Sequence, residues 1–87
     1  MIDPAEDLYD VCEHRLLPLV RDESIRDDVA LYIDVGEGYH AVNAAIGDLA
    51  FAGAAFPADL ADYFRGQFAN DSVHADFYKL LGEVKIG

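Results

Sequence analysis

Apolar side chains recur every three or four residues along almost the whole chain, which is the periodicity of amphipathic α-helices. No stretch shows the strict alternation of a convincing strand. The β-branched residues within 29–35 could support a short strand, but the helix signals on either side favour a helix there. The pattern predicts an all-α fold, a compact bundle of four or five short helices, in a single domain that covers residues 1–87.

The first predicted helix runs from about Pro4 to Leu17. Asp3 can cap its N-terminus, and Pro4 suits its first position because a proline there loses no helical hydrogen bond. Pro18 breaks or bends the chain after this helix, because its ring clashes with the preceding turn. The side chains expected to face the core from this helix are Leu8, Val11, Cys12 and Leu16.

The second and third predicted helices are each closed by a glycine. One begins at Ser24, which forms a weakened capping box with Asp27, and ends at Gly36. The next spans about Glu37 to Ala52. The side chains expected to face the core are Ile25, Val29, Tyr32 and Ile33 from the second helix, and Val42, Ala45, Ile46 and Leu49 from the third.

A fourth helix is predicted to open at Pro57, and a fifth to be capped by Asn70 or Ser72. Their expected core residues are Leu60, Phe64 and Phe68, followed by Val73, Phe77, Leu80, Leu81 and Val84. Four aromatic side chains fall partly or wholly outside the apolar stripes: Tyr39, Phe51, Tyr63 and Tyr78.

The net charge of the chain restricts the classes of molecule that it is expected to bind. Seventeen acidic residues against six basic ones give a net charge of −11. Such a field repels nucleic acid and anionic membranes, so we expect neither as a partner, and it attracts basic proteins. The most apolar stretch, from Ala41 to Pro57, is interrupted by Asn43 and Asp48 and is too short to span a bilayer.

Most of the acidic excess lies in the first two helices, because residues 1–40 hold eleven acids against three bases. Helical geometry predicts one acidic ridge on each helix, opposite the apolar stripe. Two interpretations remain open: a solvated face that keeps the protein soluble, or a preorganised surface that docks on a basic protein. Leu31, an apolar residue among the acids, favours a contact surface. The candidate partner-binding residues are Glu6, Asp10, Glu13, Glu23, Asp27, Leu31, Asp34, Glu37 and Tyr39.

Little in the sequence indicates catalysis. The only cysteine, Cys12, lies in an apolar stripe beside acids that raise its pKa, and three histidines lack the HxxxH or ExxH spacing of metal sites. We therefore expect no enzymatic activity, no metal and no cofactor. The absence of a signal peptide and of paired cysteines predicts a protein of the reducing cytoplasm.

Residues 27–46, DDVALYIDVGEGYHAVNAAI, resemble the small immunity proteins of bacterial polymorphic and contact-dependent toxin systems, most closely the Maf-type group. The likeness consists of a helix that ends in a Gly-Glu turn, an alanine-containing helix, and a further helix after the short loop at 56–60. The resemblance implies a non-enzymatic protein that binds and neutralises a cognate toxin, often a nuclease. The alternative is a helical subunit or homo-oligomer whose acidity serves only solubility.

Overall fold

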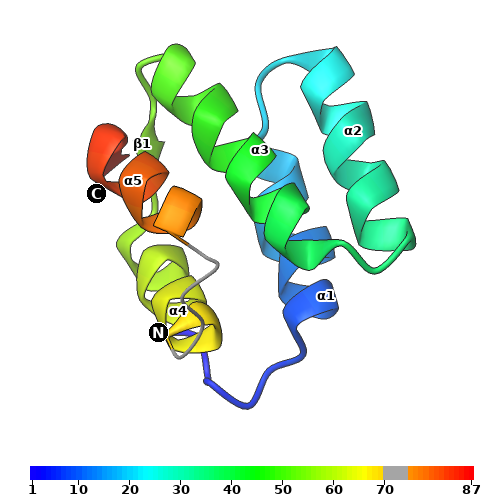
Figure 1. The fold of residues 1–87 in the computed structure, drawn as a ribbon, viewed down its shortest axis with the longest axis vertical. Helices are drawn as coiled ribbons and strands as arrows, with labels where there is room; N and C mark the ends of the chain where they lie inside the picture. The colour runs from blue at the N-terminus through cyan, green and yellow to red at the C-terminus, as the bar shows by residue number, and fades with distance from the viewer. Residues whose placement is uncertain (70–74) are drawn as a thin grey trace.

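The structure is a computed structural model that describes residues 1–69 and 75–87. Its helices pack into a compact bundle, as the periodicity predicted, and Figure 1 shows α3 lying between α2 and α5. The elements in chain order are α1 (Leu8–Val11), a π-helix (Cys12–Leu16), a 3-10 helix (Leu17–Leu19), α2 (Glu23–Asp34), α3 (Gly38–Phe51), β1 (Ala55–Phe56), α4 (Ala58–Phe68), α5 (Ala75–Glu83) and β2 (Lys85–Ile86).

The start of the first helix differs from the prediction. Asp3 accepts a hydrogen bond from the Ala5 amide and stabilises a turn, whereas Asp7 caps α1 through the amides of Tyr9 and Asp10. Both residues are aspartates, which are favourable N-caps, so capping preference alone does not determine which of them starts the helix. The predicted helix therefore begins four residues late, at Leu8.

The helical segment that begins with α1 changes its hydrogen-bonding pattern along its length. Residues Cys12–Leu16 form a π-helix, with the Leu17 amide bonded to the Cys12 carbonyl, and the chain then tightens into a 3-10 turn around Pro18. Pro18 explains why an α-helix does not continue, because its ring would clash with the carbonyl four residues earlier. The predicted core residues of this segment are nevertheless inside: Val11, Cys12 and Leu16 are buried, and Leu8 is half-buried.

The α2–α3 hairpin follows the sequence closely. The segment 29–35 is helical rather than extended up to Asp34, but the N-cap of α2 is Asp22 and not Ser24, which lies inside the first turn. The end of α2 has the bonds of a Schellman motif, from the Glu37 amide to the Tyr32 carbonyl (2.8 Å) and from the Gly36 amide to the Ile33 carbonyl (3.3 Å).

Two glycines shape this corner for different reasons. Gly36 has a φ of 77°, a left-handed conformation that only glycine adopts without cost. Gly38 has an ordinary φ, but a β-carbon at this position would lie 2.9 Å from Leu8 Cδ2. The missing side chain therefore lets the start of α3 approach α1 closely. Gly53 ends α3 with a φ of 69°, as predicted.

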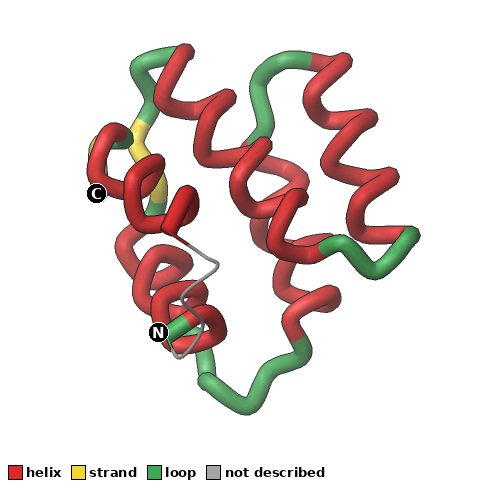
Figure 2. Tube along the Cα trace, in the orientation of Figure 1, coloured by secondary structure: helices red, strands yellow, loops and turns green. Residues whose placement is uncertain are grey.

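A short parallel pair of strands corrects the expectation of a purely helical chain. Ala55 pairs with Lys85 and Phe56 with Ile86, which brings the C-terminal end of the chain beside the segment that follows α3 (Figure 2). Phe56 is extended partly because it precedes Pro57, and a residue before proline avoids the α conformation. Pro57 is the N-cap of α4 rather than its first residue.

The core is rich in phenylalanine where α4 meets α5. Phe64 stacks on Phe68 with ring centroids 6.2 Å apart, and Phe68 meets Phe77 edge-on at 5.1 Å. The expected inward residues of α4 and α5 are buried, apart from Leu80, which is half-buried, and Val73, which lies outside the described residues. The predicted caps Asn70 and Ser72 also lie outside them.

Tyr63 contradicts its predicted position outside the core. Its side chain is buried, and its hydroxyl donates a 2.6 Å hydrogen bond to the Glu6 carbonyl. Burial, followed by the nearby Cys12, Asp7 and Glu6, raises the pKa of this phenol. A residue that lies beside the apolar stripe of one helix can thus be covered by a distant segment, here the turn before α1.

Candidate protein-binding surface

A row of mostly acidic side chains lies on the exposed side of α2. The helix is started by Asp22, whose pKa is lowered first by the hydrogen bond from the Ser24 hydroxyl (2.9 Å) and then by those from the Ile25 and Ser24 amides. A rotation of about 100° per residue then places one row of exposed side chains opposite buried Val29. This row comprises Glu23, Asp27, Leu31 and Asp34.

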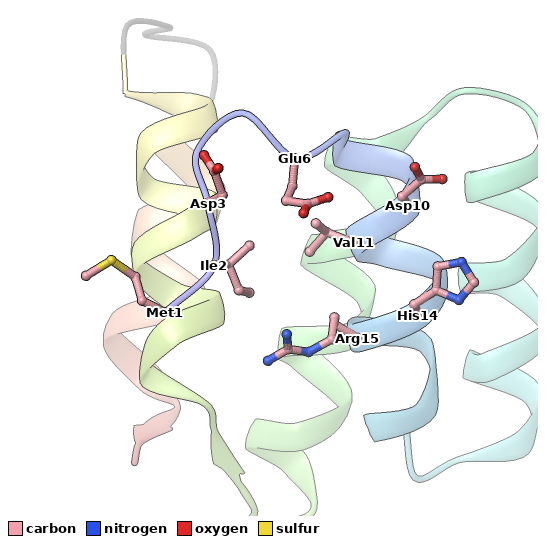
Figure 3. Close-up of a pocket in the computed structure, with 8 residues that line it drawn as sticks. All are labelled: Met1, Ile2, Asp3, Glu6, Asp10, Val11, His14 and Arg15. Atoms are coloured by element: carbon pink, nitrogen blue, oxygen red, sulfur yellow. The ribbon is translucent and has the colours of Figure 1, made fainter.

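Glu6, Asp10 and Glu13 were predicted to share one helix face, and this prediction is wrong for Glu6, which lies in the turn before α1. Asp10 belongs to α1 and Glu13 to the π-helix, and all three acids are exposed. Figure 3 shows Glu6 extending from the turn toward α1, and Asp10 and His14 on the same side of the helix. A hollow of about 360 Å³ lies here, lined by Met1, Ile2, Asp3, Glu6, Asp10, Val11, His14 and Arg15.

A hydrogen bond joins the two elements that carry most of these acids. The Tyr9 hydroxyl donates to the Gly36 carbonyl at 2.6 Å, so the beginning of α1 is held beside the end of α2. Glu37 follows this contact directly. We call the resulting set the acidic surface; it comprises Glu6, Asp10, Glu13, Glu23, Asp27, Asp34 and Glu37.

The carboxylates of the acidic surface lack permanent counter-charges. Arg15 pairs with Asp59 at 2.8 Å, and Arg65 pairs with Asp62 at 2.8 Å, so these cations neutralise other acids. Within residues 1–69 and 75–87, no member of the acidic surface forms a salt bridge with lysine or arginine. Two members lie close to a histidine. Glu13 Oε2 is 3.6 Å from His14 Nε2, and Glu37 Oε2 is 3.8 Å from His40 Nε2.

The two remaining candidates differ in how accessible they are. Leu31 is 58% exposed, within the acidic row of α2. Tyr39 is half-buried: its ring meets Phe68 edge-on at 5.6 Å, and its hydroxyl accepts a 3.3 Å hydrogen bond from the Phe77 amide. Tyr39 therefore links α3 to α4 and α5, whereas Leu31 is available to a partner.

One cluster was not anticipated by the sequence analysis, which considered only pairs with HxxxH or ExxH spacing. Ligand atoms of Asp10, Glu13 and His14 all lie within 4.8 Å of one another. The available signal was an aspartate four residues before a histidine, a spacing that shares one side of a helix. All three side chains are exposed and also belong to the solvated surface, so we assign no ion to them.

The buried cysteine has an unreactive thiol. Burial, followed by the nearby Asp7 carboxylate, raises the pKa of Cys12 to about 12. The sequence predicted that acids beside Cys12 raise its pKa, whereas in the structure burial is the larger cause and Asp7 is the acid that contributes. Because the thiol stays protonated at neutral pH, Cys12 contributes packing rather than a nucleophile.

Comparison with known proteins adds no relative: no family model, no curated protein and no solved structure matches this chain. The likeness to immunity proteins therefore stays a prediction. Among the described helices, none combines the length and apolar character that crossing a membrane requires.

Proposed function

We propose that this protein is an immunity-type inhibitor, which binds a basic toxin domain in the cytoplasm through the acidic surface on α1 and α2. The observation that carries the proposal is that the first two helical regions expose seven carboxylates that no lysine or arginine of the described chain neutralises. Like charges held close together cost stability, and a cationic partner removes that cost.

A basic toxin, such as a nuclease with a positively charged substrate groove, offers the matching surface. The acidic residues would accelerate the encounter, and those desolvated in the complex would form ion pairs. Leu31 would add an apolar contact within the charged row, since interfaces combine an apolar centre with a polar rim. No catalytic step is part of this function.

The test is binding between the tagged chain and the protein encoded by the adjacent gene, measured at low and at physiological salt. We expect one stoichiometric basic partner whose affinity falls as salt rises. Reversal of Asp27 and Asp34 together to lysine should weaken binding by about 2–5 kcal/mol if both are desolvated in the complex.

A matched control is available on α4. Asp27→Lys and Asp62→Lys each replace an exposed helical aspartate and each shift the net charge from −11 to −9. Asp62→Lys also removes the exposed ion pair with Arg65, which contributes little to stability. The proposal requires Asp27→Lys to weaken binding clearly more than Asp62→Lys, with helix content unchanged in both. Equal effects would mean that only the total charge matters. A salt-insensitive homo-oligomer without a basic partner would favour the alternative, a helical subunit or self-assembling protein.

A further inference from the structure

The outer face of α3 is distinct from the acidic surface. Asn43, Gly47 and Phe51 are spaced four residues apart and lie on the side of α3 opposite the buried Ala45 and Leu49. Figure 1 shows α2 on one side of this helix and α5 on the other. Because both neighbours pack against the flanks of α3, its outer face forms the floor between two helical walls.

Two hollows lie along this floor, one on each side of Asn43. The hollow toward α2 has a volume of about 370 Å³, and the residues that line it are Asp22, Ile25, Asn43, Ala44, Gly47, Asp48 and Phe51. The hollow toward α5 has a volume of about 380 Å³ and is lined by Asn43, Asp76, Lys79, Leu80 and Glu83. We call the two hollows and the floor between them the α3 groove.

Three residues on the floor are not accounted for by packing within the chain. Phe51 is 96% exposed, although burying its ring would be favourable. The Asn43 Oδ1 atom is buried and accepts no hydrogen bond from the residues that the structure describes, which is costly for a polar atom. Gly47 leaves open space where a side chain could stand, so another backbone can approach α3 closely.

The charge around the α3 groove selects the kind of occupant. Among the described residues, its walls carry the acids Asp22, Asp76 and Glu83 and one base, Lys79. The Asp48 carboxylate adds a further negative charge. A second copy of this chain would bring another net charge of −11 to an acidic groove. A cationic segment with an apolar side is the complementary ligand.

We propose that the α3 groove binds a cationic amphipathic helix of a partner protein. Apolar side chains of that helix would cover Phe51 and Ile25, while its lysines or arginines would face Asp22 on one wall and Asp76 on the other. The site shares no residue with the acidic surface, which it adjoins at Asp22 and Glu23, and it does not depend on the toxin.

The test measures binding of a synthetic amphipathic helix of leucine and lysine, about five turns long, to the intact protein by fluorescence anisotropy. A peptide of the same composition in scrambled order carries the same charge without an apolar side. Gly47→Leu fills the floor of the α3 groove, while Gly66→Leu places the same side chain on the exposed side of α4. Neither β-carbon would meet another group within 4 Å, so both variants should fold.

We expect the amphipathic peptide to bind at least about tenfold more tightly than the scrambled one. Gly47→Leu and Phe51→Ala should each weaken its binding about tenfold or more, whereas Gly66→Leu should leave it unchanged. Equal binding of the two peptides, or equal behaviour of the two leucine variants, would overturn the proposal. Dimerisation of the protein alone that Gly47→Leu abolishes would also overturn it, in favour of a second copy as occupant.

Discussion

The α2–α3 hairpin of residues 23–51 and the N-terminal segment of residues 1–20 have similar apolar periodicity, yet they fold by different means. In the hairpin, three of the four helix ends are set by a neighbouring residue: Asp22 caps the start of α2, and Gly36 and Gly53 follow the ends of α2 and α3. In the N-terminal segment, a turn, an α-helix, a π-helix and a 3-10 helix follow one another within residues 4–19.

The difference teaches where local signals suffice. The hairpin has a side-chain cap on α2, a glycine after each helix and no proline, so its helix boundaries follow from local signals. The N-terminal segment has two possible caps and a proline near its end, and its final form depends on the surfaces it covers. The Tyr63 hydroxyl donates a hydrogen bond to the Glu6 carbonyl, and Arg15 forms a salt bridge with Asp59 of α4.

The largest expected effect comes from Leu16→Ala, which tests whether the N-terminal segment belongs to the core. Leu16 is fully buried within the π-helix, so its truncation should lower the free energy of unfolding by about 2–5 kcal/mol. Urea unfolding measures this change. Leu31→Ala, the matched truncation at an exposed site on α2, should change stability by no more than about 0.5 kcal/mol. Similar values for the two variants would contradict the assignment of Leu16 to the core.

Gly36→Ala should destabilise the hairpin at the turn between α2 and α3, which local backbone geometry determines. Alanine in the left-handed conformation of Gly36 should cost about 1–2 kcal/mol of stability. Gly47→Ala should instead raise stability by about 0.5–1 kcal/mol, because Gly47 lies inside α3 with open space around it. Thermal unfolding of both variants gives the comparison, and a loss of stability in both would argue against the backbone explanation.

Tyr9→Phe removes the hydrogen bond that joins the two regions. We expect a loss of about 0.5–1.5 kcal/mol, toward the lower end because the bond is open to water. Hydrogen exchange should show faster opening of α1 while α2 keeps its protection. Equal acceleration in both helices would mean that the regions unfold as one unit.

The smallest expected effect concerns pH. The pKa of Asp22 is lowered from 3.8 by the hydrogen bonds of the α2 cap, so its folded value lies below its unfolded one. The stabilisation is therefore complete above the unfolded pKa and is lost as the pH falls through the folded pKa. Asp22→Asn keeps a capping side chain without titrating. Its unfolding free energy should decline less between pH 5 and pH 2 than that of the wild type, and parallel declines would refute the assignment.

Much of the candidate binding surface could be predicted from the sequence, because exposed acids on a regular helix follow from spacing alone. Asp27, Leu31 and Asp34 lie together on α2 as expected. Glu6 does not share a helix with Asp10, because α1 starts after it. Tyr39 could not be placed from its own helix, since its ring packs on Phe68 and its hydroxyl binds the Phe77 amide, both far away in the chain.

The sequence by itself determined the helical class, the α2–α3 hairpin with its glycine ends, and the apolar stripes that became the core. These features depend on periodicity and on capping, which act over a few residues. Only the tertiary structure decided which aspartate caps α1, that Tyr63 is buried, and that residues 55–56 pair with 85–86. Each of these choices depends on contacts between distant segments, whose energies exceed the small differences between local alternatives.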